Sequence, residues 1–416
     1  MHFDDNFISL VKDRNPLFEV INDYVPMKQQ GQLWVANCPF HAGDRNPSFK
    51  YYPKDEGAHC YGCGTNIGDS IDFIMKIENL QFPEAVEFLA ERANIPLPEN
   101  NDSDSSRQIR MFRENLENKS REFWINLMTK KENQHIKNYL LQRGLTEEDI
   151  TKWRIGYCDF TYANRHKENR NDDDARRFKK FTNRIIFSVL DHRNQIVGFS
   201  GRRLPDQDDK FVKYLNSSDK DNPLFKKNEI VYGLNYAKKA IADLDFVIWV
   251  EGFFDVILMH QIGVENTVAS MGTAITPEQI KLVKRFTNNV ILFLDPDEAG
   301  QEAMKKSLEL FSAENIEVKI IQGINGLDPA ETVRKLGNNF KDWLYLNAKT
   351  IEQYYVDKFL ARYNNQLNMA KKDMINNLKS IFANRLDHIE TDIALGAICN
   401  AINVDINILK NMIAKN

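Results

Sequence analysis

The chain has 416 residues, which is too long for one ordinary domain and suggests about three. Its hydrophobic content of 42% is enough for a sizeable core, and its net charge of −4 excludes a protein coated with positive charge, although a local basic track for nucleic acid stays open. No apolar run reaches membrane-spanning length and no signal-peptide pattern opens the sequence, so we expect a cytoplasmic protein without a membrane partner.

The N-terminal part alternates helical and strand-like patterns, which we assign to a first domain at residues 1–98. Apolar residues have helical spacing over 7–11, 17–21, 71–77 and 85–90, and strand-like pieces cover 33–35 and 48–52. Residues 96–106 are polar and rich in Asn, Asp and Ser, which predicts a linker.

Five cysteines, an odd and sparse set, argue against a disulfide framework. Three of them lie close together, in Cys38-Pro-Phe-His41 followed by 18 residues and Cys60-Tyr-Gly-Cys63. Paired ligands with this spacing form the two knuckles of a tetrahedral site, and thiolate with imidazole suits one structural Zn²⁺ ion. Two alternatives remain, namely free buried thiols with a surface histidine, or His59 as the fourth ligand. We favour His41, because His59 abuts Cys60 and neighbouring residues rarely chelate one tetrahedral ion together.

Aromatic and basic residues surround this cluster. They are Trp34, Phe49, Tyr51, Tyr52 and Tyr61, interleaved with Arg45, Lys50 and Lys54. Bases stack on aromatic rings and phosphates pair with cations, so the set suits single-stranded nucleic acid. The alternative is that the aromatic residues fill a small core.

The middle of the chain, residues 107–242, predicts a mixed α+β unit. A charged helical pattern covers 107–130, and β-rich pieces follow at 184–190, 195–200 and 230–232. A run of cations without an intervening acid comprises Arg176, Arg177, Lys179, Lys180 and Arg184. Such a run is compatible with phosphate binding, but a solvated surface is the simpler interpretation of each single charge.

Strands and helices alternate over residues 243–340, which predicts a parallel sheet flanked by helices. The expected strands are 246–250, 267–269, 290–294 and 318–321, and the expected helices run from about 251 to 260, 277 to 285 and 299 to 311. From about residue 341 the pattern is helical throughout, and residues 350–416 have the apolar spacing of a small helical bundle.

Acidic residues follow two of these expected strands. Glu251 comes directly after the first strand, and Asp295 and Asp297 come directly after the third. The carboxyl ends of parallel strands share one edge, so these acids should gather there, with Asp255 one helical turn from Glu251 and Asp328 after the next strand. A carboxylate cluster favours Mg²⁺, the usual electrophile for phosphoryl transfer. The alternative for Asp297 alone is that it caps the following helix.

Several motifs, in one order over about residues 1–335, resemble those of a known family. Near the N-terminus they are the cysteine pairs above and the segment 68–73, and in the middle they are Arg143-Gly144-Leu145, segments 155–157, 184–187 and 198–202, Lys213-Tyr214-Leu215-Asn216-Ser217, segment 224–227 and Tyr232-Gly233-Leu234. Further on they are Glu251-Gly252-Phe253-Phe254-Asp255, Met271-Gly272-Thr273-Ala274 and Asp295-Pro296-Asp297-Glu298-Ala299-Gly300. The chain resembles the DnaG-type bacterial DNA primases, with a CHC2 zinc ribbon and a TOPRIM catalytic domain.

The resemblance implies a multidomain fold of α+β and α/β parts, namely a zinc ribbon, a mixed primase core with a TOPRIM parallel sheet, and C-terminal helices. It implies a DNA-dependent RNA polymerase that makes short RNA primers on single-stranded DNA from ribonucleoside triphosphates. The implied cofactors are one structural Zn²⁺ and catalytic Mg²⁺ or Mn²⁺, the latter on Glu251, Asp295 and Asp297 with support from Asp255 and Asp328. The implied nucleotide- and template-binding residues are Arg184, Arg202, Lys213, Tyr214, Asn216 and Lys227.

The sequence departs from the family pattern at a few places. Ala330 stands where a second aspartate is usual, which puts an outer metal site in doubt, and Ser188 replaces a usual proline. The C-terminal helical region is shorter than the helicase-binding domain of cellular primases, so we expect a diverged module for a DnaB-like helicase, in a bacterial or phage-infected cell. We expect a monomer.

Two rival functions remain. The first is a TOPRIM nuclease or topoisomerase, and the second is a DNA-binding protein with an inactive TOPRIM domain. A phosphate-binding GxxxxGK[ST] loop is absent from the sequence, so a fused ATP-driven helicase is not expected.

Overall fold

The computed structural model describes residues 3–41, 46–78, 80–98, 104–159, 177–207, 210–220, 222–272, 274–363, 378, 382, 389–402 and 405–414. Arg45, Arg176 and Thr273, named above, lie outside these ranges. Among the helices in the described ranges, none combines the length and apolar character that crossing a bilayer requires.

The N-terminal domain packs four helices against an antiparallel sheet. The helices are α1 (Asp5–Asp13), α2 (Leu17–Tyr24), α3 (Ser70–Glu78) and α4 (Phe82–Arg92), and the strands, paired in chain order, are β1 (Lys28–Gln30), β2 (Leu33–Ala36), β3 (Phe49–Tyr52), β4 (Gly57–Cys60) and β5 (Asn66–Ile67). Asp4 caps α1 by accepting from the backbone N–H of Phe7 at 2.7 Å. The domain has its own hydrophobic core, to which α2, β3 and α3 contribute Val20, Phe49 and Phe73.

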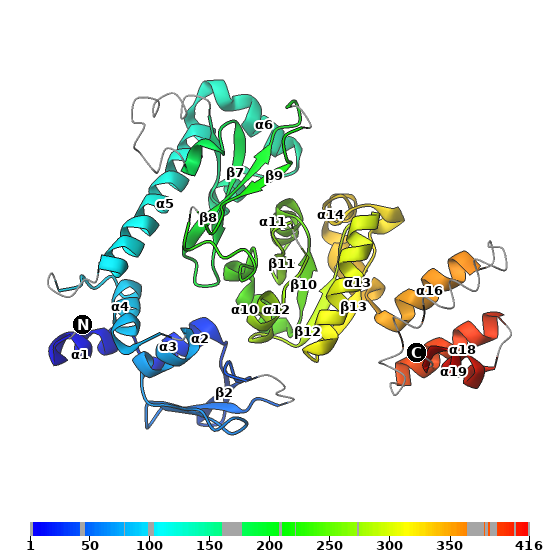
Figure 1. Ribbon diagram of the computed structural model, residues 1–416, viewed down its shortest axis with the longest axis horizontal. Helices are drawn as coiled ribbons and strands as arrows, with labels where there is room; N and C mark the ends of the chain where they lie inside the picture. Colours follow the sequence, from blue (N-terminus) through cyan, green and yellow to red (C-terminus); the bar gives the residue numbers. More distant parts are fainter. Residues whose placement is uncertain are drawn as a thin grey trace.

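A long helix, α5 (Asp104–Thr129), leads from this domain into the middle of the chain (Figure 1). It begins three residues before the predicted start at residue 107. After the short turn η1 (Lys131–Asn133) come α6 (Gln134–Gln142) and α7 (Glu147–Lys152), and then an antiparallel sheet of β6 (Ile155–Cys158), β7 (Arg184–Leu190), β8 (Ile196–Arg203) and β9 (Tyr214–Asn216). A side chain at Gly156 would stand 2.4 Å from the Phe123 backbone, so the glycine lets α5 pack directly on β6.

The parallel sheet predicted from the alternating pattern is present. Its order is β11 (Thr267–Ala269), β10 (Val247–Val250), β12 (Asn289–Leu292), β13 (Glu317–Ile320) and β14 (Lys349–Thr350), parallel except for β14. The flanking helices are α10 (Leu234–Leu244), α11 (Phe253–Gln261), α12 (Pro277–Lys284), α13 (Glu298–Ala313) and α14 (Pro329–Leu336). All four residues of β10 are buried, as expected of a strand covered on both faces.

Two local predictions were wrong. Residues 230–232 do not form a strand, because Tyr232 makes only an isolated bridge to Ala269. The region after residue 341 is not helical throughout, because Lys349 and Thr350 pair with β13. In both cases tertiary contacts with the parallel sheet decided the local structure.

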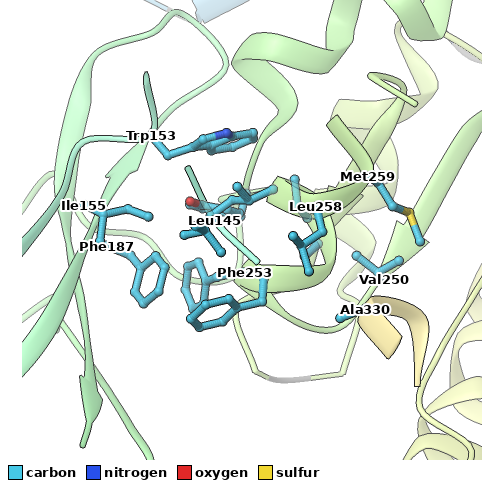
Figure 2. Packing of buried hydrophobic residues seen from close by; sticks show 14 of the residues in the cluster. Leu145, Trp153, Ile155, Phe187, Val250, Phe253, Leu258, Met259 and Ala330 are labelled. Carbon is cyan, nitrogen blue, oxygen red and sulfur yellow. The ribbon is translucent and has the colours of Figure 1, made fainter. Parts of the chain in front are cut away.

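One hydrophobic core joins the middle of the chain to the parallel sheet. Figure 2 shows Trp153, Ile155 and Phe187, from the middle of the chain, facing Phe253 and Leu258 of α11. The Phe187 and Phe253 rings stack with centroids 4.9 Å apart. The antiparallel and parallel sheets are therefore fixed relative to each other by shared apolar burial.

The C-terminal region is helical apart from β14. It contains the short η3 (Gly337–Asn339) and α15 (Phe340–Asn347), then α16 (Ile351–Tyr363), α18 (Ile389–Ile402) and α19 (Ile406–Ala414). Its last helices lie at the far end of the molecule from the N-terminal domain (Figure 1). They have a small core of their own, which includes Phe359, Leu395 and Leu409.

Polar contacts hold the N-terminal domain against the rest of the chain. Arg193, in the turn between β7 and β8, pairs with Glu78 at 3.4 Å and with Asp191 at 2.9 Å. Lys238 of α10 donates to the carbonyl of Asp23 at 2.8 Å.

Candidate zinc ribbon and candidate metal-binding active site

The residues predicted to hold zinc come together. The ligand atoms of Cys38, His41, Cys60 and Cys63 all lie within 4.8 Å of one another, and no other such group of three or more occurs in the described part of the chain. The first pair of ligands comes from the loop after β2, and the second pair comes from the end of β4. Strand β3 lies between β2 and β4 in the sheet. A side chain at Gly62 would stand 2.6 Å from His41 Nε2, so the second knuckle needs glycine there.

The surroundings of Cys60 favour its thiolate. Burial opposes ionisation, but hydrogen bonds from Ser48 and from the backbone N–H groups of Cys63 and Gly62 lower the pKa of the Cys60 thiol to about 6. Ser48 Oγ lies 3.2 Å from Cys60 Sγ and 3.4 Å from His41 Nε2. Sequence spacing did not indicate Ser48. Only the structure identifies it, because Ser48 directly precedes β3 and lies beside the two ligand atoms.

His59 is engaged elsewhere, which supports the choice of His41. Its Nδ1 lies 2.6 Å from Asn66 Oδ1, and its ring packs edge-on against Tyr61. Tyr61 is 64% exposed, its hydroxyl lies 2.6 Å from that of Tyr52, and Lys50 Nζ lies 4.9 Å from the Tyr61 ring centroid. By contrast, Phe49 and Tyr51 are buried, so the core interpretation holds for these two residues, while stacking of bases on the exposed rings stays a prediction.

The predicted acids lie at the carboxyl edge of the parallel sheet. Glu251 follows β10, Asp295 follows β12, and Glu251 Oε1 accepts a hydrogen bond from the backbone N–H of Asp295 at 3.1 Å. A side chain at Gly300 would stand 2.9 Å from Glu251 Oε1 and 2.2 Å from the Asp295 carbonyl oxygen. Only glycine therefore lets α13 begin this close to the two acids.

Burial and mutual repulsion both disfavour the charged form of these carboxylates, and a bound cation would offset both. Burial and then the charge of Asp295 raise the pKa of Glu251. Burial, Asp328 and Asp297 raise the pKa of Asp295, against which Lys213 acts to lower it. A donor set of carboxylate oxygens that disfavour each other's charge suits Mg²⁺, which would supply the missing counter-charge.

Asp297 and Asp328 each use one oxygen to cap a helix. Asp297 Oδ1 accepts from the backbone N–H of Gly300 at 2.8 Å, at the start of α13. Asp328 Oδ1 accepts from the N–H of Glu331 at 2.7 Å, at the start of α14. The capping alternative for Asp297 is thus present, and it leaves the second oxygen of each carboxylate for a cation.

Asp255 is buried and connects two elements of the site through hydrogen bonds. Its carboxylate accepts from the backbone N–H of Gly252 and from that of Ala330, each at 3.0 Å. Burial, then the charges of Asp295 and Asp328, raise the pKa of Asp255 to about 7. The first contact fixes the loop that holds Glu251, and the second fixes the helix that Asp328 caps. Ala330 itself is buried in the shared core, and its side chain offers no ligand.

We expect Asp255→Ala to weaken Mg²⁺ binding, because loss of its two hydrogen bonds should displace Glu251 and Asp328. The change leaves the buried N–H group of Ala330 and the partly buried N–H group of Gly252 unpaired, which should lower the free energy of unfolding by about 1–3 kcal/mol. Primer synthesis should fall about 10-fold or more, with a higher Mg²⁺ concentration needed for half-maximal rate. Urea unfolding and Mg²⁺ titrations measure both effects, with Asp243→Ala, an exposed acid on α10, as the control. A variant whose primer synthesis falls while its stability and its Mg²⁺ requirement stay unchanged would contradict the positioning role.

The predicted basic residues differ in exposure. Lys213 is exposed, and its charge acts to lower the pKa of Asp295, so it lies near enough to the acids to influence them. Lys227 is half-buried, and burial lowers its pKa. Asn216 Nδ2 donates to the carbonyl of Met271, in the loop after β11, at 3.4 Å. Strand β9 therefore reaches the carboxyl edge of the parallel sheet.

Arg184 and Arg202 are buried, and both make protein contacts. Arg184 donates to the carbonyls of Gly201 and Val212, at 3.2 and 2.9 Å. Arg202 donates to the hydroxyls of Tyr214 and Tyr139, at 3.1 and 2.9 Å. Their assignment to template or nucleotide binding stays a prediction, and the contacts give both a part in holding β8, β9 and α6 together.

Arg143 was not among the predicted site residues. Its guanidinium lies 4.7 Å from the centroid of the Phe254 ring, and that of Arg202 lies 4.9 Å from the same centroid. Phe254 precedes Asp255, so both cations lie next to the acid edge. The Arg-Gly-Leu motif was the signal that could have identified it.

Comparisons with known proteins agree with this architecture. Residues 3–105 match the CHC2 zinc finger family, 163–238 the N-terminal domain of the DNA primase catalytic core, and 248–333 the Toprim-like family. A DNA primase of Clostridium acetobutylicum is 31% identical over 96% of this chain and 68% of that protein. The chain belongs to the DNA primase family.

Further matches extend the comparison. The DNA primase of Halalkalibacterium halodurans is 34% identical over 82% of this chain and 59% of its own length. The chain thus spans 59% and 68% of these two curated relatives. The crystal structure of the Aquifex aeolicus primase, comprising its zinc-binding and RNA polymerase domains, is 26% identical, has a TM-score of 0.60, and is matched over 97% of this chain and 98% of that one.

These findings confirm the predicted family, fold class and enzyme class. They also confirm the cofactors that go with the family, a structural zinc in the ribbon and catalytic Mg²⁺ in the Toprim domain. The individual roles of the acids and cations, and the domain limits at residues 98, 107, 242, 243, 340 and 350, stay predictions.

Proposed function

We propose that this primase makes short RNA primers on single-stranded DNA at the carboxyl edge of the parallel sheet, which β9 reaches through Asn216. The observation that carries this is that opposite charges lie near each other there. Glu251 and Asp295 follow two strands of the parallel sheet, and the charge of Lys213, which directly precedes β9 of the antiparallel sheet, acts on Asp295. Acids suit the metal and the cation suits phosphates, so the edge has the two parts that a nucleotidyl transfer needs.

Glu251, Asp295 and Asp297 would hold Mg²⁺, with Asp328 at the rim. When bound, Mg²⁺ lowers the pKa of the attacking hydroxyl and neutralises charge on the phosphates. The chain itself contributes placement. Asp255 fixes the loop after β10 relative to the start of α14, and the backbone N–H of Asp295 orients Glu251. Positioning of this kind is a large part of phosphoryl-transfer catalysis.

Lys213, Lys227 and Asn216 would contact the triphosphate or the template backbone, with Tyr214 beside them. Tyr214 lies between the two parts of the core, with its ring centroid 5.5 Å from that of Phe253 and its hydroxyl on Arg202. Arg202 and Arg184 would act by holding these strands in place. A polymerase needs such a triphosphate site, whereas a nuclease does not.

The zinc ribbon would bind the template strand. Lys50, Tyr52, His59 and Tyr61 lie on one side of β3 and β4, at alternate positions that share a face. The exposed Tyr61 ring offers a base a stacking surface, and Lys50 offers a phosphate a cation. Zinc holds that surface in shape and takes no part in the chemistry.

Other partners are proposed on sequence grounds. A DnaB-like helicase would bind the C-terminal helices, and the chain would act as a monomer in the cytoplasm of a bacterial or phage-infected cell. Co-purification with the replicative helicase of the host would test the first of these.

The direct test is primer synthesis. The chain is incubated with single-stranded DNA, labelled ribonucleoside triphosphates and Mg²⁺ or Mn²⁺, with and without the host helicase. We expect short RNA products that depend on both template and nucleotides. Cleavage of the DNA in the absence of nucleotides would identify a nuclease instead, and DNA binding without either reaction would identify an inactive binding protein.

A further inference from the structure

The loop between β8 and β9 exposes two apolar side chains. Phe211 and Val212 are each 58% exposed, while most large apolar residues of this part of the chain are buried. Isolated exposed apolar residues are common, but two consecutive exposed apolar residues, one of them aromatic, expose more apolar area to water at a hydration cost.

Hydrogen bonds from both sides fix this loop. The buried Arg184 donates to the carbonyl of Val212 at 2.9 Å, and the backbone N–H of Arg203 donates to the carbonyl of Lys213 at 2.9 Å. On the other limb, Arg203 donates to the carbonyl of Gln207 at 3.2 Å, and Gln207 donates to that of Asn183 at 2.7 Å. The loop thus holds Phe211 outward in a defined place, and burying a charged Arg184 is part of what this arrangement costs.

The loop leads straight to the catalytic edge. Lys213 follows Phe211 by two residues, so their Cα atoms are at most about 7 Å apart. Lys213 acts on Asp295, and β9 continues to Tyr214, which packs on Phe253, and to Asn216, which reaches Met271. Phe211 therefore lies two residues before the strand that reaches the catalytic edge, and outside the acid cluster itself.

One exposed cation follows the apolar pair directly. Lys213 is exposed, and the buried Arg184 lies behind Val212, on its carbonyl. An exposed apolar ring two residues from an exposed cation matches a strand whose bases are unpaired and whose phosphates are negative, and it matches a protein surface or a paired duplex less well.

We propose that Phe211 stacks on an unpaired base of the single-stranded DNA template as the strand enters the active site. Lys213 contacts the neighbouring phosphate, and Val212 covers the edge of the base. The ring adds affinity that depends on the base and not on salt, in contrast to the lysine. This inference rests on the proposed template-dependent function and names one residue that holds the template.

The test is equilibrium binding of a fluorescent oligonucleotide to the full chain. Two probes of equal length are compared by anisotropy, an oligothymidylate and the same backbone with abasic sites. Phe211→Ala should weaken binding to oligothymidylate by about 5- to 10-fold, as expected for loss of one stacked base, with an unchanged salt slope. The same change should have little effect on the abasic probe, and Phe211→Trp should restore binding to oligothymidylate.

A matched control is Phe82→Ala. Phe82 is also an exposed phenylalanine, 41% exposed, at the start of α4 in the N-terminal domain, and it should leave both probes unaffected. Because Phe211 is exposed, its substitutions should leave the thermal unfolding midpoint unchanged, which separates lost contact from lost fold.

The outcomes separate this inference from the function beneath it. If the wild-type chain binds neither probe, the proposed function fails and this inference with it. If the wild-type chain binds and Phe211→Ala binds oligothymidylate equally well, the stacking role alone is wrong. An equal loss on both probes also overturns it, because the ring would then act through the loop's shape.

Discussion

Asp295→Asn should abolish primer synthesis, with a loss of at least about 100-fold, while leaving the fold and DNA binding intact. Asp295 follows β12, contacts Glu251 through its backbone N–H, and feels the charges of Asp297 and Asp328. Asparagine keeps the size and the backbone contact but removes the charge that Mg²⁺ needs. Primer yield on single-stranded DNA measures the first effect, and oligonucleotide anisotropy measures the second.

The same substitution has an expected effect on stability with a defined sign. The pKa of Asp295 is raised, so its charged form is disfavoured in the metal-free fold. At neutral pH, Asp295→Asn should therefore leave the melting temperature equal or higher without Mg²⁺. Added Mg²⁺ should raise the melting temperature of the wild type and not that of the variant, because a ligand stabilises only the state that binds it.

Glu302→Gln is the matched control for this experiment. Glu302 lies exposed on α13, one turn beyond the cluster, and pairs with Lys306 at 2.7 Å. The Glu302→Gln variant should retain both primer synthesis and the Mg²⁺-dependent rise in melting temperature. Full primer synthesis by Asp295→Asn would remove Asp295 from the metal site, and the same loss in Glu302→Gln would show that any acid in this region matters.

Removal of zinc should unfold the N-terminal domain and leave the rest of the chain folded. The wild type should contain one zinc per chain by elemental analysis, and Cys60→Ala should contain almost none. Structural zinc contributes about 10–16 kcal/mol in small zinc domains, far more than a short sheet of this kind can replace. The domain's hydrophobic core is separate from the one shared by the antiparallel and parallel sheets, so unfolding should stop at the boundary.

Limited proteolysis and primer synthesis would follow this change. Fragments from residues 1–98 should disappear while a core fragment persists, and template-dependent initiation should fall sharply. Cys399→Ala is the control, since Cys399 is a buried thiol in the C-terminal core and no zinc ligand. Retention of one zinc by Cys60→Ala, or its loss in Cys399→Ala, would contradict the assignment of the ligands.

Local patterns predicted most of the secondary structure. Val247, Ile248 and Trp249 are buried on both faces, so an unbroken apolar run was a sufficient sign of a central strand. The wrong assignments, at residues 230–232 and 349–350, concern short pieces whose state depends on a partner strand. Such pieces carry too few residues for a periodic signal, and a single long-range pairing outweighs their propensity.

The zinc ligands were determined by the sequence itself. Two pairs with short internal spacing lie at the tips of hairpins, and the tetrahedral preference of zinc then leaves little choice beyond His41 against His59. Membership in the family was likewise readable from the order of motifs. The parallel sheet followed from alternating strands and helices, and with it the edge at which Glu251 and Asp295 meet.

Only the tertiary structure separated residues that share a type. The sequence presents Arg184, Arg202 and Lys213 as three cations in matching motifs. The two arginines are buried and donate to carbonyl and hydroxyl oxygens of the protein, whereas Lys213 is exposed and its charge acts on Asp295. The sequence likewise presents Asp255 and Asp297 as members of one cluster, yet Asp255 holds two backbone N–H groups together. Side-chain roles of this kind depend on which long-range partner lies within hydrogen-bond distance, and packing of distant elements decides that where spacing along the chain cannot.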